Sequence, residues 1–117
     1  MSLIQTKNGI CVLSSWDFSK LIQVSHKQVQ KTITEFEPHL LEVTKVQSND
    51  PFQKYFRVGK IGHPVIEIFC EANHIKYLIL FLGAHSSRIV KAKKFLVQHA
   101  DLEDYEFLNA LINLWPD

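Results

Sequence analysis

Histidine and cysteine are the residues of this 117-residue chain with the most obvious chemistry, because both ligate metals and cysteine also acts as a nucleophile. No two histidines have the i, i+4 or H-x₃₋₅-H spacing of a zinc site. The two cysteines are far apart and form no C-x-x-C pair. The spacing therefore predicts no metal site. The residues concerned are His26, His39, His63, His74, His85, His99, Cys11 and Cys70.

Catalytic motifs are also missing from the sequence. It has no G-x-S-x-G, no glycine-rich phosphate loop, and no cysteine in a recognisable nucleophile frame. No pair of acids is marked out by its spacing. We therefore expect a protein that is not an enzyme and needs no cofactor.

A run of hydrogen-bonding side chains in QVSHKQVQKTITEF, residues 23–36, is the strongest functional signal. Val29, Ile33 and Phe36 fall at i, i+4 and i+7, which predicts one buried face of a helix. The remaining positions are basic or neutral up to Glu35. Such groups bind adenine, guanine and phosphate, so the outer face is a candidate DNA-binding surface; a protein-binding surface and an ordinary solvated face are the alternatives. The predicted DNA-binding residues are His26, Lys27, Gln30, Lys31 and Thr34.

Two short helices position this surface. A serine at 14 or 15 caps the first, whose apolar residues Phe18, Leu21 and Ile22 share one face. Ser25 and Gln28 form an S-x-x-Q capping box for the second, and Pro38 is expected to end it. Residues 14–36 therefore predict a helix-turn-helix. Strands expected at 40–46, 53–58 and 65–69 would form a small antiparallel sheet, placing a wing-like unit within 40–69.

One hairpin and three further helices complete the predicted fold. Asn8-Gly9 predicts a tight turn between strands 3–5 and 10–13. Three helices are expected over 71–115: one ended by Gly83 as a left-handed cap, one started by a serine at 86 or 87, and one capped by Asp101. The predicted fold is α+β, a single domain over 1–117 that combines a winged helix-turn-helix-like unit, a small antiparallel sheet and a C-terminal helical part.

Charge is nearly balanced overall, with a formal net charge of +1 and a pI near 7.8, which argues weakly against nucleic-acid binding. Its distribution is uneven. Residues 86–99 hold four cations and no acid, whereas residues 100–117 hold five acids and no cation. The first stretch is either a secondary basic surface or an ordinary solvated face. Its residues are Arg88, Lys91, Lys93 and Lys94.

The chain also gives expectations about location and association. Its longest apolar run is too short to cross a bilayer and no secretory signal is visible, so we expect a cytoplasmic protein with reduced thiols and no membrane partner. The last helix has a wide apolar surface that predicts a homodimer. The alternative is that this helix folds back and completes the core around residues 77–82. The predicted interface is Phe107, Leu108, Leu111, Ile112 and Trp115.

Two segments resemble the phage regulatory Rha family. SSWDFSKLIQVSHKQVQKTI is similar to that family's opening, with its His-Lys pair followed by Val29 and Ile33. YLILFLGAHSSRIVKAKKFLVQHA is similar to its second half. The similarity covers about residues 10–100. The matching positions of the second half are Phe81, Gly83, Ala92, Lys93 and Phe95.

The resemblance implies a phage or prophage regulator that binds double-stranded DNA through a winged helix-turn-helix-like unit. The chain departs from the family at CEANH, where an acid and a glycine are usual, and we expect no counterpart of the further C-terminal domain of many members. The alternative is a small phage-encoded antagonist of a host protein, of the anti-restriction or anti-CRISPR type, without DNA affinity. The near-neutral charge favours this second function.

Overall fold

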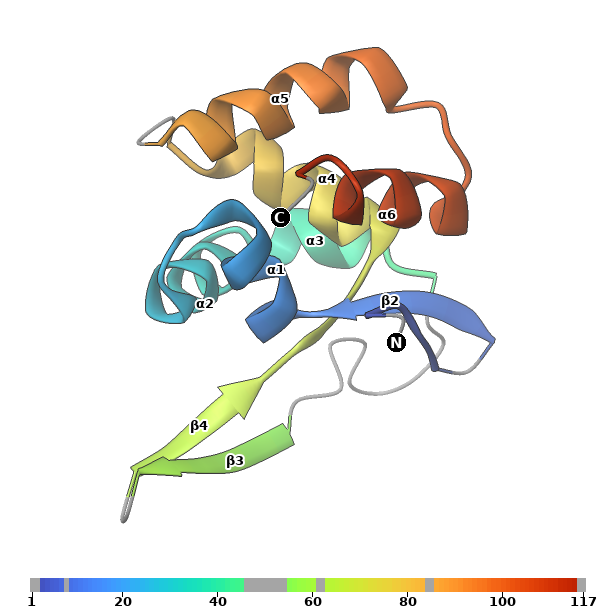
Figure 1. Cartoon of the computed structure of the whole chain (residues 1–117). Helices are drawn as coiled ribbons and strands as arrows, with labels where there is room; N and C mark the ends of the chain where they lie inside the picture. Colours follow the sequence, from blue (N-terminus) through green and yellow to red (C-terminus); the bar gives the residue numbers. More distant parts are fainter. Residues whose placement is uncertain (1–2, 8, 46–54, 61–62, 84–85, 116–117) are drawn as a thin grey trace.

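The computed structural model describes residues 3–7, 9–45, 55–60, 63–83 and 86–115 and has an α+β fold, which confirms the predicted class at that level. A three-stranded antiparallel sheet and a separate two-stranded hairpin accompany six helices among these residues (Figure 1). In chain order the elements are β1 (Gln5–Lys7), β2 (Ile10–Ser14), α1 (Ser15–Ile22), α2 (His26–Glu35), α3 (Glu37–Glu42), β3 (Tyr55–Lys60), β4 (His63–Glu67), β5 (Phe69–Glu71), α4 (Ala72–Phe81), α5 (Ser87–His99) and α6 (Asp104–Ile112).

The three-stranded sheet has the order β1-β2-β5 and joins the two halves of the sequence. β1 and β2 form the predicted hairpin, with Lys7 opposite Ile10. Gly9 has a φ of 77°, a conformation that glycine adopts without steric cost, while Asn8 lies outside the described residues. β2 also pairs with β5, bringing Leu13 opposite Cys70. Because the two strands are antiparallel, with Ser14 opposite Phe69, this pairing places the start of α1 beside the start of β5.

α4 lies at the centre of the helical part. Its apolar residues occupy most of its circumference, and it packs against α2, α3, α5 and α6 as well as β2 and β5. Ile75 and Leu78 have no exposed surface. A helix that is apolar nearly all round is stable only when it is covered on many sides, as α4 is. The helix does not end at Gly83 as predicted, because its C-cap is Leu82, which has extended geometry.

The strand predicted over 40–46 is not formed by residues 40–45, while residue 46 lies outside the described residues. Glu37–Glu42 form α3, and Pro38 lies in the first turn of that helix instead of simply ending α2. Proline is favourable there because the first-turn N–H groups have no intrahelical acceptor. Leu40 is fully buried. The predicted hairpin is present as β3 and β4, whereas β5 belongs to the N-terminal sheet and not to a sheet with them.

α6 folds back onto the chain's own core. Phe107, Leu108 and Leu111 have no exposed surface, and α6 packs against α4, α5 and β2. The expectation that these residues form an exposed dimer surface was therefore wrong; Ile112 and Trp115 are partly buried against the same core. Asp101 is not the helix cap either, since α6 begins after Glu103.

Replacing Leu111 by Ala tests the fold-back. The loss of a fully buried leucine should lower the free energy of unfolding by about 2–5 kcal/mol, by the same amount at every protein concentration. Urea unfolding at two concentrations measures this. Tyr105→Ala, at a position that is 53% exposed on the same helix, is the control and should change stability by less than about 0.5 kcal/mol. A loss that depends on concentration would contradict the fold-back.

Candidate functional site

The turn between α1 and α2 is defined by backbone hydrogen bonds. Gln23 has left-handed geometry, with φ 55° and ψ 46°. Its N–H donates to Lys20 O, and Val24 N–H donates to Ser19 O at 3.0 Å, the pattern of a Schellman motif. Ser25 then caps α2, because its Oγ accepts from Gln28 N–H at 3.2 Å. Two helices joined by three residues therefore have a fixed relative orientation.

His26 is a structural residue, which corrects its predicted outward position. It is 7% exposed, and its ring stacks on Trp16 with 3.9 Å between centroids and 5° between planes. Its Nε2 lies 2.8 Å from Ser15 Oγ. The same Oγ accepts from Ile68 N–H, while Ser15 N–H donates to Ile68 O at 2.7 Å. This junction, formed by Ser15, Trp16, His26 and Ile68, joins α1, α2 and the start of β5.

The other predicted residues of α2 lie as expected, with one exception. Lys27, Lys31 and Thr34 are exposed at i, i+4 and i+7, while Gln30 is partly buried. Val29 and Ile33 form the buried face. The structure thus leaves a solvent face on α2 with two cations and a hydroxyl.

Gln28 belongs to this solvent face as well. Its side chain is exposed, and Glu35 is exposed two turns further along the helix. The sequence analysis assigned Gln28 to a capping box, and only the bond from its backbone N–H to Ser25 is seen. Helical spacing alone could have identified it, because residues 27, 28 and 31 share one side of a helix.

Three of the four cations of the predicted secondary basic surface donate hydrogen bonds to carbonyls at or near the ends of other helices. Arg88 donates to Leu21 O at the end of α1 at 3.0 Å, and Lys91 donates to Leu114 O after α6. Lys93 donates to the carbonyls of Ile79 and Leu80 in the last turn of α4, and burial lowers its pKa. Carbonyls there carry the negative end of the helix dipole, so these cations stabilise the packing of α5. Lys94 is exposed.

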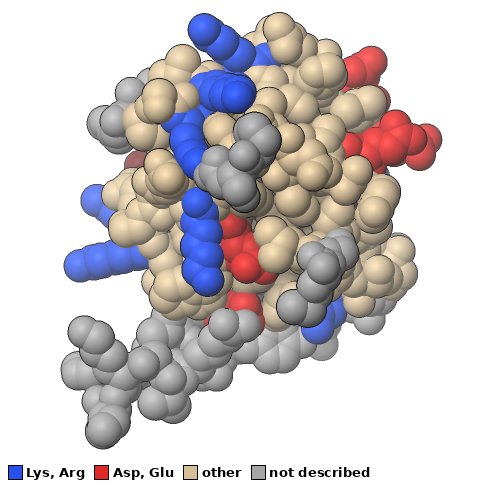
Figure 2. Space-filling view, in the orientation of Figure 1, with Lys and Arg blue, Asp and Glu red and all other residues tan. Residues whose placement is uncertain are grey.

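Charges are separated across the molecule. Figure 2 shows lysines and arginines descending across one face and extending on the side where α2 lies, while acids gather at the opposite upper edge, near α6 and the segment before it; further acids lie beside the basic column in the middle of this face. The exposed acids of that edge are Asp101, Glu103 and Glu106.

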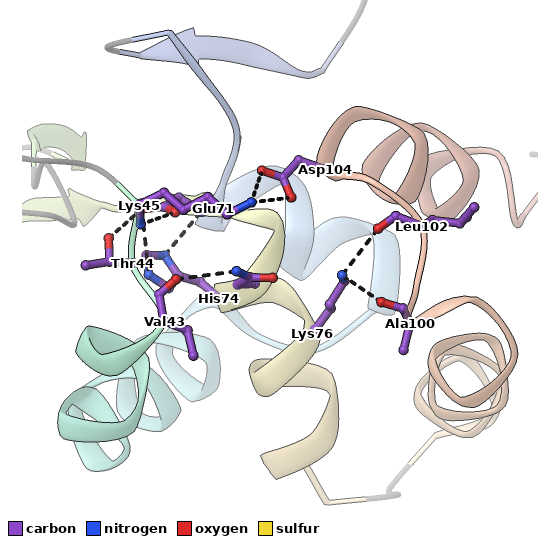
Figure 3. A network of polar contacts seen from close by, with 10 residues as sticks. Val43, Thr44, Lys45, Glu71, His74, Lys76, Ala100, Leu102 and Asp104 are labelled. Atoms are coloured by element: carbon purple, nitrogen blue, oxygen red, sulfur yellow. Dashed lines mark hydrogen bonds and ion pairs between the residues drawn. The ribbon is translucent and has the colours of Figure 1, made fainter.

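A second polar cluster lies between α3 and α4 (Figure 3). Glu71, 1% exposed, accepts hydrogen bonds from Thr44 Oγ1 and from Lys45 N–H at 2.7 Å. Its side chain also accepts from the third-position amide of α4, and Glu71 N–H donates to His74 Nδ1 at 3.1 Å. These reciprocal bonds form a capping box for the central helix. The cluster has the features of an anchor for the chain after α3.

Cys70 does not have the surroundings of a reactive thiol. Burial, assisted by the Glu71 charge, raises the pKa of Cys70 to about 12, so its thiol stays protonated and is a poor nucleophile. Within the described residues, no three side chains of His, Cys, Asp or Glu gather closely enough to hold a metal ion. Of the helices in the described ranges, none has the length and apolar character needed to cross a membrane.

Comparisons with known proteins give no relative: no family model, curated protein or solved structure matches this chain. The resemblance to the Rha family therefore stays a prediction carried by the quoted residues.

Replacing His26 by Ala should lower the free energy of unfolding by about 3 kcal/mol. The variant loses a stacked ring pair and leaves the buried Ser15 hydroxyl with one contact fewer, each worth about 1 kcal/mol or more. Thermal or urea unfolding measures the change. The control is His39→Ala, at an exposed position of α3, where a smaller effect is expected. Equal losses at both positions would contradict the structural role of His26.

Acid should destabilise the fold through His74. Its Nδ1 accepts from an N–H donor and so carries no proton, and burial lowers its pKa below the ordinary 6.5 despite the opposing effect of Glu71. The unfolded chain therefore binds the proton more readily. This contribution to stability is complete above pH 6.5 and is lost as pH falls below it. In His74→Gln, the free energy of unfolding measured in urea should change less steeply with pH between about pH 7.5 and pH 5 than in the unmodified chain. An unchanged slope would contradict this role.

Proposed function

We propose that this chain is a phage-type regulatory protein that binds double-stranded DNA through α1 and α2, with α2 as the recognition helix. The observation that carries the proposal is the solvent face of α2, where Lys27, Lys31 and Thr34 project from a helix whose other side is fixed by the stack of His26 on Trp16. A polar face held on a rigid support is what reading DNA requires, because a recognition residue must be held in place before contact.

The dimensions of α2 suit a major groove. Its ten residues span roughly 15 Å, and a helix with its side chains fits a groove about 12 Å wide. Lys27 and Lys31 would reach phosphates or guanine, and Gln28 would pair with adenine. α2 has no acid in its first turn, so its N-terminal end, which usually contacts base edges, is free of charge repulsion.

The hairpin of β3 and β4 supports the same proposal. It projects from the body of the molecule on the side of α1 and α2 (Figure 1). Its strands are paired from Tyr55–Glu67 to Lys60–His63. At about 3.3 Å per residue, six residues reach roughly 20 Å, enough to contact the backbone beside a recognition helix. We assign it the role of a wing.

The separation of charge favours one orientation on DNA. The acids at 101–106 lie at the edge away from α2 (Figure 2), so the negative potential of DNA would repel that edge and attract the α2 side. Because the net charge is only +1, we expect modest affinity with a moderate salt dependence.

A host protein is the second candidate partner. The observation in its favour is that Arg88, Lys91 and Lys93 already bind backbone carbonyls, which leaves fewer cations for phosphates. In this function the α2 face would bind a protein surface, and the chain would block that protein's activity without contacting DNA.

Replacing Lys27 and Lys31 together by Ala should weaken binding to duplex DNA and reduce the slope of log K against log salt by about two, since each phosphate contact contributes about 0.9. Fluorescence anisotropy with a random duplex from low to moderate salt measures both values. Circular dichroism checks the fold.

The matched control is Lys45→Ala, because Lys45 pairs with Asp104 on the acidic side of the molecule. It should leave the slope unchanged. Absence of DNA binding by the unmodified chain at the lowest salt would reject the proposal in favour of a protein partner. If Lys45→Ala reduced the salt slope as much as the double replacement on α2, the DNA contact would not lie on α2.

A further inference from the structure

The outer side of α5 carries a row of exposed residues that alternate in character. Val90, Lys94, Val97 and Asp101 follow one another at i, i+4, i+7 and i+11, so they lie on one side of the helix and its continuation, opposite the buried Ile89, Ala92 and Phe95. Ala100, which ends the helix, still has right-handed helical geometry. Val97 is 84% exposed, more than the other large apolar side chains exposed in the described ranges.

A separate apolar surface is exposed where α4 meets another side of α5. Leu80 is 56% exposed, although it lies on the otherwise buried central helix. It lines a groove of about 410 Å³ together with Tyr77, Leu96 and Ala100. Exposed apolar residues with charges beside them, such as Val90 and Val97 of the row, are typical of a protein-binding surface. We call the set Val90, Lys94, Val97 and Asp101 the α5 face.

We propose that the α5 face binds a second copy of this chain, with the two α5 helices antiparallel about a two-fold axis between positions 97 and 98. In that arrangement Lys94 of each chain lies opposite Asp101 of the other, and the two Val97 side chains meet near the axis. One surface therefore supplies both halves of the contact, as an isologous dimer requires.

Charge complementarity is the argument for this occupant. Lys94 and Asp101 are seven residues apart, about 10 Å along a helix, too far to form an ion pair with each other. An antiparallel second copy brings opposite charges together twice. A parallel copy would instead place like charges side by side, which is unfavourable.

The neighbouring cations of α5 do not compete with Lys94 for Asp101 of the second copy, because they contact carbonyls of their own chain. Lys93 is directed to the carbonyls of Ile79 and Leu80, and Lys91 to Leu114 O. Lys94 is therefore the cation of the basic stretch whose direction matches the row. The surface also differs from the apolar face of α6, which is buried in the chain's own core, so it gives association a different location from that predicted by the sequence.

Sedimentation velocity of the full chain, without DNA, tests the proposal at concentrations from low to high micromolar. The unmodified chain should show a concentration-dependent dimer. Val97→Glu should abolish it without loss of fold, because the position is exposed. Leu41→Glu is the matched control, since Leu41 is 43% exposed on α3, outside the α5 face, and should leave the dimer intact.

A charge exchange tests the antiparallel pairing itself. Lys94→Glu and Asp101→Lys should each weaken the dimer at low salt by about tenfold or more, because both contacts then join like charges. The variant carrying both changes should regain the affinity of the unmodified chain. A monomer at high micromolar concentration, an unaffected Val97→Glu dimer, or failure of the double variant to recover would each overturn the proposal. None of these results depends on DNA binding, so the proposed function is tested separately.

Discussion

The buried hydrogen bonds of Ser15 are the constraint on which the rest of the structure depends. This one residue joins the backbone of Ile68 in both directions and contacts the ring of His26, so it connects three segments from both halves of the sequence. Its side chain has no exposed surface, and a buried hydroxyl must find its partners within the protein. The position of α2 follows from these bonds and from the stack of His26 on Trp16.

The cations of α5 illustrate how charge supports packing here. Three of them bind carbonyls at or near the ends of other helices, and Lys76 on α4 does the same for Ala100 O after α5 (Figure 3). Each bond places a positive charge at the negative end of a helix. A sequence stretch that resembles a nucleic-acid surface is therefore mostly a means of fastening helices together. That leaves α2 as the exposed polar face that best fits the proposed DNA contact.

Much of the local structure could be predicted because it depends on near neighbours. Ser25 caps α2, the apolar period of α4 gives a buried helix, and Asn8-Gly9 precedes a paired strand. Residues 40–46 were assigned wrongly because a short apolar run fits a strand or a helix equally well, and Leu40 is buried only through tertiary contacts. Local sequence could not distinguish the two.

The candidate site could be predicted only where it depends on near neighbours in the sequence. Lys27, Lys31 and Thr34 follow from helical spacing, whereas the burial of His26 depends on Trp16, ten positions earlier, and on the Ser15–Ile68 contact. Likewise, the apolar face of α6 read as a dimer surface because nothing in its own sequence indicates that α4 and β2 cover it. Side chains that reach across the fold, such as Arg88 to Leu21 O, leave no local signal.

The proposed function depends on contact between the solvent face of α2 and DNA. Amide chemical-shift mapping tests it most directly, by titrating the isotope-labelled chain with a short random duplex at low salt. We expect shifts concentrated on residues 25–35 and in the β3–β4 hairpin, with residues 101–106 unchanged, and we expect the shifts to reverse when salt is added. Shifts confined to the acidic edge, or none at all, would contradict the proposed function.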